Sequence, residues 1–173
     1  VPIAEVAGLN VDQCCIGSFT NSSLYDMLKV AAILKGHTVA PDVSLVIAPG
    51  SKQVLNMLAE NGALADMIAA GARIIECGCG PCICMGQSPK TNAVSLRTNN
   101  RNFYGRSGTK SASIYLVSPE VAAVAAITGV VTDPADFGEP PVVEMPDSFL
   151  VSDNMVIIPS EKSSDIEVVR GPN

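Results

Sequence analysis

Apolar residues along the first 130 positions alternate between short continuous runs and a helical spacing. The run over residues 11–17 is followed by a cluster of Ser, Thr and Asn, and this order predicts a buried strand and then a loop. Apolar side chains then recur every three or four residues, which predicts a helix whose buried face carries Leu24, Met27, Leu28 and Ala31.

The same order of elements repeats further along the chain. Residues 43–48 form a β-branched run that ends in a turn at Pro49-Gly50, Ser51 is a candidate N-cap, and Gly62 would stop the helix that follows. Ser118 and Pro119 are typical of a helix start, and Gly129 of its end. The other predicted elements are a helix over 64–70 and strands over 73–76, 93–96 and 113–117.

Strands that alternate with helices through short connections indicate an α/β fold. Parallel neighbours need crossover connections, so we expect a mostly parallel sheet with helices on both faces, a three-layer α/β/α domain, over residues 1–138. From Gly138 the composition becomes rich in proline and acidic residues, which predicts an extended tail or linker over 139–173 toward a missing domain. Both ends of the sequence suggest cuts within a longer protein.

Composition and charge narrow the function classes. Hydrophobic residues make up 47% of the chain, yet tryptophan is absent, so the core must consist of Val, Ala, Ile, Leu and Met. A net charge of −6 disfavours nucleic acid and anionic membranes as partners. No apolar run approaches the roughly 20 residues that span a bilayer, and we expect a cytoplasmic protein.

The six cysteines fall in two places, Cys14-Cys15 and the segment 77–84, which reads CGCGPCIC. A secreted disulfide scaffold would scatter its cysteines, so this clustering favours metal or redox chemistry. Only Gly80 and Pro81 separate Cys79 from Cys82, a spacing that lets two thiolates converge on one centre. Zinc, an iron–sulfur cluster and a dithiol all remain open, although the single histidine argues against a mixed zinc site.

Two arginines, Arg101 and Arg106, lie five residues apart in a predicted loop rich in amides. Guanidinium groups bind carboxylates in bidentate geometry, so the pair is a candidate site for an acidic substrate. The alternative for any such pair is that both are solvated surface charges.

Several separate motifs, in order along the chain, resemble the aconitase superfamily. They are Gly17-Ser18-Phe19-Thr20-Asn21, Pro49-Gly50-Ser51, Cys79-Gly80-Pro81-Cys82, Asn100-Arg101-Asn102-Phe103-Tyr104-Gly105-Arg106 and Ser118-Pro119-Glu120. The resemblance runs from about Val11 to Pro134. It implies the third of four domains of a hydro-lyase of the tricarboxylic acid cycle, which isomerises citrate and isocitrate through cis-aconitate with a [4Fe-4S] cluster.

The resemblance also implies roles for individual residues. Cys79 and Cys82 match two cluster ligands, and Ser18 lies in the matching catalytic loop. The substrate-binding residues would be Asn100, Arg101 and Arg106, holding the carboxylates of a tricarboxylate. The family reads Gly-Ser-Cys-Thr-Asn where this chain has Phe19, so the third ligand position holds a residue that cannot coordinate iron. Cys15 and Cys84 are the candidate substitutes.

The loops that carry these motifs each follow a predicted strand, so we expect them to meet at the carboxyl edge of the sheet. The first loop also precedes a helix N-terminus, which favours anions. We expect a hydro-lyase fragment without turnover of its own, its remaining groups supplied by further domains. The alternatives are a cluster-less binding module, a zinc or thiol protein, and a purely structural domain.

Overall fold

The computed structural model describes residues 1–151, 153–162, 164 and 166–171. Five parallel strands form one sheet in the order β3-β2-β1-β4-β5. The strands are β1 (Gln13–Ile16), β2 (Ser44–Ile47), β3 (Arg73–Ile74), β4 (Val94–Arg97) and β5 (Ser113–Leu116). The predicted α/β class with a parallel sheet is therefore confirmed, and β1, the first strand of the chain, lies at its centre.

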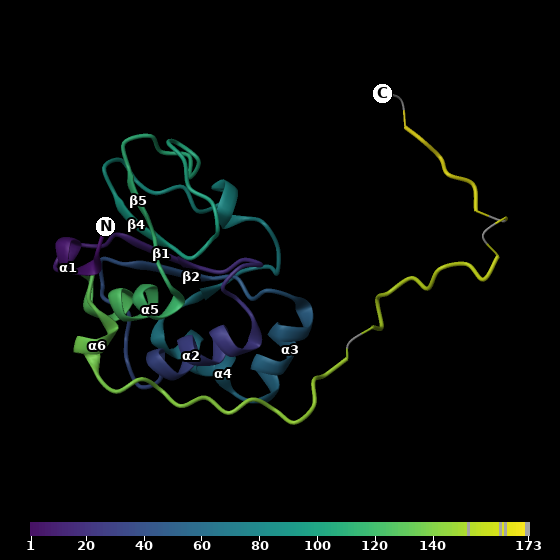
Figure 1. The fold of residues 1–173 in the computed structure, drawn as a ribbon, viewed down its shortest axis with the longest axis horizontal. Coiled ribbons are helices and arrows are strands. Elements are labelled where there is room, and N and C mark those ends of the chain that lie inside the picture. Colours follow the sequence, from purple (N-terminus) through teal and green to yellow (C-terminus); the bar gives the residue numbers. More distant parts are fainter. Residues whose placement is uncertain (152, 163, 165, 172–173) are drawn as a thin grey trace.

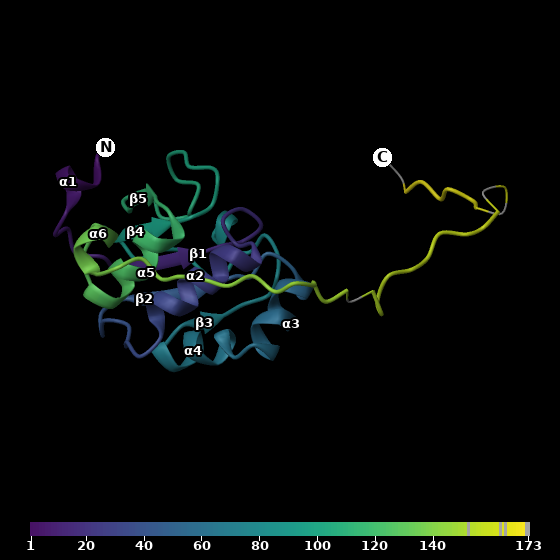
Figure 2. The same cartoon turned by 60° about the horizontal axis from the view of Figure 1, so that its bottom comes forward.

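Four longer helices lie together beneath the sheet in the view of Figure 1, and they come forward in the turned view of Figure 2, where α2 and α5 overlap the strands. They are α2 (Leu24–Leu34), α3 (Lys52–Glu60), α4 (Ala63–Ala70) and α5 (Pro119–Thr128). Long connections and the short 3-10 helix η1 (Pro81–Ile83) cover the opposite side. The three layers are thus unequal, with regular helices dominating one of them.

Local capping explains why most helix boundaries match their predictions. The side chains of Ser51 and Ser118 accept hydrogen bonds from the amides of Val54 and Val121, which satisfies otherwise unpaired N–H groups. Gly71 and Gly129 end α4 and α5 in the left-handed conformation that glycine adopts without strain. The short helices α1 (Ile3–Val6) and α6 (Pro134–Phe137) were not predicted, because four residues are too few to show a period.

The two faces of the sheet differ in chemistry. Strand side chains alternate in direction, and the helix-facing set joins the main hydrophobic core. It includes Cys14, Ile16, Leu45, Ile47 and Leu96.

On the same side, α5 packs on β1 with four fully buried alanines, whose small side chains let helix and sheet approach closely. The face toward the connections instead carries Gln13, Ser95 and Arg97, which are buried and polar.

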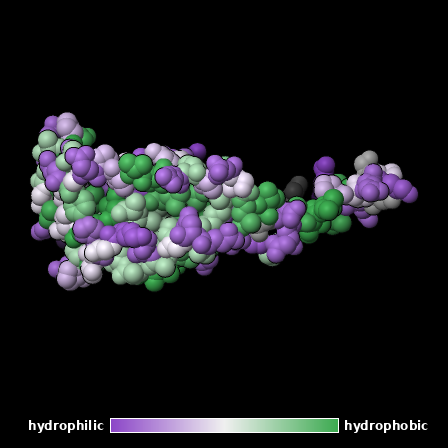
Figure 3. All heavy atoms as spheres, turned by 90° about the horizontal axis from the view of Figure 1, so that it is seen from below, coloured by the Kyte–Doolittle hydropathy of each residue, from purple (hydrophilic) through white to green (hydrophobic). Residues whose placement is uncertain are grey.

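Beyond Gly138 the described chain runs past the helices and then away from the body (Figure 1). Residues 144–151 lie along a groove beside Leu28 and Met57, and Leu150 packs against the core. Farther along, the tail exposes large apolar side chains, among them Met155, Val156, Ile157 and Ile158. Figure 3 shows green, hydrophobic spheres along this tail. No helix of the described residues is long and apolar enough to cross a membrane.

Candidate active site at the carboxyl edge of the sheet

A pocket of about 240 Å³ opens where three connections meet beyond the carboxyl ends of the strands. These are the first loop (residues 17–23), the cysteine loop (75–93, between β3 and β4) and the arginine loop (98–112, between β4 and β5). The residues to which the family resemblance gave a role here, Ser18, Cys79, Cys82, Asn100, Arg101 and Arg106, all line it. The complete lining is Ser18, Phe19, Thr20, Cys79, Cys82, Asn99, Asn100, Arg101 and Arg106.

The first loop is held by hydrogen bonds from neighbouring strand ends. The Gly17 amide donates to the Thr98 hydroxyl at 2.9 Å, and the Asn21 side-chain amide donates to the Thr98 carbonyl at 2.6 Å. On the other side, the Gly50 amide donates to the Ser22 carbonyl at 3.1 Å. The loop is thereby fixed between the ends of β2 and β4, and Ser18, which is 2% exposed, faces a defined pocket.

The arginine loop gives the pocket its charge. Arg101 and Arg106 line it together with the amide side chains of Asn99 and Asn100, and no carboxylate side chain does. The Arg106 guanidinium lies 5.3 Å from the centre of the Phe103 ring, a cation–π contact that orients it. Arg106 Nε is buried and has no hydrogen-bond partner among the described residues. A buried N–H in that state is an unused donor for an anionic ligand.

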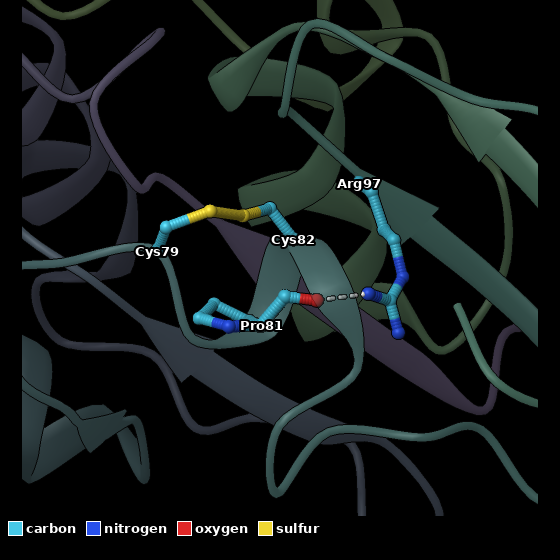
Figure 4. Close-up of a disulfide and its surroundings, with 4 residues drawn as sticks. All are labelled: Cys79, Pro81, Cys82 and Arg97. Carbon is cyan, nitrogen blue, oxygen red and sulfur yellow. Dashed lines mark hydrogen bonds between the residues drawn. A yellow bond between two sulfur atoms is a disulfide. The ribbon is translucent and has the colours of Figure 1, made fainter. Parts of the chain in front are cut away.

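The cysteine loop contributes a disulfide. Cys79 and Cys82 are joined by an S–S bond of 2.11 Å across the turn that contains Pro81, as Figure 4 shows. Both residues line the pocket. The two sulfur atoms therefore lie together, as the Cys-Gly-Pro-Cys spacing predicted. As a disulfide the pair is not a metal ligand, and reduction to thiols must precede any metal binding.

The other cysteines lie outside the pocket lining. Cys14 and Cys15 are buried in β1, where burial raises the pKa of both thiols, that of Cys15 to about 11. Cys77 and Cys84 are half-buried free thiols in the cysteine loop, and burial raises the pKa of Cys77. Neither proposed substitute for a third ligand, Cys15 or Cys84, is among the pocket residues.

The N-terminus of α2 does not provide the anion-binding amides that the sequence suggested. Ser23 and Asp26 form a capping box, in which each side chain accepts a hydrogen bond from the other residue's amide. The Asp26 carboxylate therefore already occupies the position that an anion would take. Neither residue lines the pocket, so the arginines alone provide its positive charge.

A further arginine was missed by the sequence analysis. Arg97, at the end of β4, is 1% exposed, and its guanidinium donates to the Pro81 and Gln87 carbonyls, each at 2.6 Å. It also donates to Gln13 Oε1 at 2.9 Å and to Ser95 Oγ at 3.2 Å. One signal was available, because Arg97 directly follows the predicted strand over 93–96 and arginine is rarely buried.

A match of the Aconitase family (aconitate hydratase) to residues 2–129 agrees with this arrangement, because it covers all three loops. The chain belongs to the aconitase family. It is 44% identical over 140 residues to the homoaconitase large subunit of Thermus thermophilus, which covers 79% of this chain and 33% of that protein. It is also 44% identical over 135 residues to the 3-isopropylmalate dehydratase large subunit of Herpetosiphon aurantiacus, covering 78% and 32%.

A third relative is the methanogen homoaconitase large subunit of Methanocaldococcus jannaschii, 40% identical over 136 residues, which is 78% of this chain and 32% of that protein. The chain thus spans about a third of the length of the curated relatives it matches. One homoaconitase and one 3-isopropylmalate dehydratase large subunit match this chain with the same identity, 44%. The matched relatives are thus named for different substrates.

Aconitase-family proteins generally bind a [4Fe-4S] cluster, which needs ligands from the protein. Cysteine thiolates hold such clusters. Two pocket residues, Cys79 and Cys82, offer sulfur, while Phe19 lines the same pocket with a side chain that cannot coordinate. Among the described residues, no three His, Cys, Asp or Glu side chains form a metal-binding group. The donor set present here does not fit a cluster held by three protein thiolates.

Proposed function

We propose that this chain is one part of an aconitase-type hydro-lyase and that it binds and orients a hydroxy-tricarboxylate. The reaction would be the isomerisation of citrate and isocitrate through cis-aconitate. The observation that carries the proposal is the unpaired, buried Nε of Arg106 in a pocket that contains a second arginine and no carboxylate side chain. A polycarboxylate would supply the missing acceptors.

Each polar group of the pocket has a proposed task. Arg106 and Arg101 would hold two substrate carboxylates, since a guanidinium fork matches both oxygens of such a group. The Asn100 amide would fix the orientation of the bound molecule. Ser18, as the catalytic residue, would place its hydroxyl at a substrate oxygen, because it is buried in the loop that faces the arginines.

The remaining acid and base groups would come from other domains of a longer protein. The matched relatives are about three times as long as the aligned segment, and two thirds of each lies outside it. The exposed apolar side chains of the tail are suited to burial against such domains. We therefore propose residues 1–138 as the substrate-binding domain and 139–173 as a linker that leads out of it.

Binding can be measured without turnover, by titrating the chain with citrate or cis-aconitate in a calorimeter. Arg106→Lys should weaken binding about tenfold, because an ammonium cannot reproduce the bidentate fork. Arg170→Lys, the same exchange in the exposed tail, should leave affinity unchanged. Equal affinity for all three proteins, or none for the unmodified chain, would refute the proposal. We also expect that the chain alone does not hydrate cis-aconitate.

The disulfide supports one alternative, a cluster-less binding or zinc-thiolate module. In that case the reduced chain would bind zinc stoichiometrically through Cys79 and Cys82 with help from Cys77 or Cys84, and citrate would not bind. Measuring zinc content and citrate affinity on the same reduced sample separates the two functions.

A further inference from the structure

The buried arginine of β4 is the strongest feature of the molecule that the proposed function does not use. Arg97 is 1% exposed, and among the described residues no ion pair compensates its charge. Burying an unpaired charge is costly unless hydrogen bonds replace its hydration. All four of its hydrogen-bond acceptors are neutral oxygens, and two of them are carbonyls of the cysteine loop.

We propose that Arg97 is the positioning residue of the cysteine pair, because its guanidinium ties both ends of the segment 81–87 to the sheet. Nη1 donates to the Pro81 carbonyl and Nη2 to the Gln87 carbonyl, each at 2.6 Å. Pro81 lies between the two cysteines, and Figure 4 shows its bond to Arg97 below and to the right of the disulfide. The position of Cys79 and Cys82 over the pocket then depends on a side chain of β4.

The Arg97 guanidinium is also hydrogen-bonded to side chains of the sheet, which fix its orientation toward the loop. Gln13 Oε1 accepts from Nη2 at 2.9 Å and from the Ser95 hydroxyl at 2.8 Å, while Ser95 Oγ accepts from Nε at 3.2 Å. These partners lie on the two central strands β1 and β4. A planar group with five donors can satisfy this whole set at once, which a lysine ammonium cannot do.

The hydrogen bonds within the loop do not replace this connection. The amides of Cys84 and Met85 donate to the carbonyls of Pro81 and Gly80, which closes a local turn. Such bonds set the shape of the turn but do not attach it to the sheet. The Arg73 guanidinium adds a bond of 3.3 Å to the Gly86 carbonyl, at an exposed position where water competes. A second buried bond, from Gln13 Nε2 on β1 to the Gln87 carbonyl, is long at 3.4 Å, whereas the two bonds from Arg97 measure 2.6 Å each. Arg97 is therefore the stronger buried attachment of the loop.

The equilibrium between the cysteine pair and glutathione tests this inference. In that exchange Cys79 and Cys82 lose two protons and two electrons to form the disulfide, while one oxidised glutathione becomes two thiols. Holding the two sulfur atoms together favours the disulfide, so Arg97→Met should shift the equilibrium constant about tenfold toward the dithiol, roughly 30 mV. Arg97→Lys should give a smaller shift in the same direction.

Leu34→Ala is the matched control for general loss of stability. Leu34 is fully buried on α2, in a core cluster on the helix side of the sheet that includes no residue of the cysteine loop. Its variant should keep the glutathione equilibrium of the unmodified chain within about twofold. An Arg97→Lys protein that folds with an unchanged equilibrium would overturn the inference, and so would an equal shift in Leu34→Ala.

A second measurement uses the unmodified chain and needs no variant to fold. After reduction of the disulfide, the amides of Met85 and Gln87 should remain protected from hydrogen exchange, because the arginine still holds the loop. Loss of that protection on reduction would show that the disulfide holds the loop, and would overturn the inference. Citrate affinity is independent of both readouts, so failure of the proposed function can be recognised separately.

Discussion

Phe19 and Cys82 line the same pocket, the first from the loop after β1 and the second from the 3-10 helix η1. The phenylalanine side chain is 64% exposed, whereas Cys82 is 5% exposed. An exposed aromatic side chain stands where the resemblance drawn from the sequence leads us to expect a cysteine. This relationship decides which chemistry the pocket can support.

Phe19→Cys should allow a [4Fe-4S] cluster to assemble, because it adds a third thiol to the pocket that holds Cys79 and Cys82. Anaerobic reconstitution of the reduced chain with iron and sulfide, read by visible absorption and bound iron, measures this. We expect close to four iron atoms per chain in the variant and substoichiometric iron in the unmodified protein.

Phe19→Ala is the control for this prediction, since it removes the ring without adding a ligand. It should behave like the unmodified chain. A stable cluster in the unmodified protein would contradict the prediction and would point to Cys15, Cys77 or Cys84 as a ligand.

Gly17→Ala should destabilise the fold by about 2–4 kcal/mol. Gly17 has a φ of +102°, and a Cβ there would collide with the Ala48 carbonyl at the end of β2. Gly36→Ala is the control, because φ is +76° but no atom lies within 4 Å of the added Cβ, so only the backbone term of about 1 kcal/mol remains. Urea unfolding measures both, and equal losses would contradict the steric argument.

Asp12 should make folding stability depend on pH in the acid range. Hydrogen bonds from Lys90 Nζ at 2.6 Å and from the Val94 amide at 2.8 Å lower the pKa of this carboxyl below its ordinary 3.8. The unfolded chain therefore binds the proton more readily, and stability rises with pH through this range. The contribution is complete above about pH 4 and is lost as pH falls through the pKa of the folded state.

Asp12→Asn should remove this contribution, which is small because the partner Lys90 is exposed to solvent. Unfolding free energies of both proteins between pH 2 and pH 7 would show a gap above about pH 4 that closes in acid. The same exchange at Asp147, in the exposed tail, is the matched control. A gap for Asp12→Asn that stays constant across the pH range would contradict the ion-pair explanation.

The sequence predicted the elements of this fold because their signals are local. The apolar run 11–17 contains β1, and the caps Ser51 and Ser118 begin α3 and α5 at the expected places. The alternation of strands and helices then implied parallel pairing, because a helical crossover between two strands of one sheet usually makes them parallel. Convergence of the loops at one sheet edge followed from the same topology, and Ser18, Cys79, Cys82, Asn100, Arg101 and Arg106 line one pocket, although the substitute ligands Cys15 and Cys84 do not.

The hydrogen-bond partners of buried side chains depend on contacts between segments that are distant in sequence. Nothing near Arg97 in sequence shows that the Pro81 and Gln87 carbonyls will lie within 2.6 Å of its guanidinium, because both come from another connection. The expected anion site at the N-terminus of α2 was wrong for a related reason, since the Asp26 side chain folds back to cap its own helix. Hydrophobic periodicity and helix capping depend on residues that are close in sequence. The sequence alone therefore determined the helices and strands and indicated the family. Charge burial and hydrogen-bond partnership arise between distant segments, and only the tertiary structure decided them.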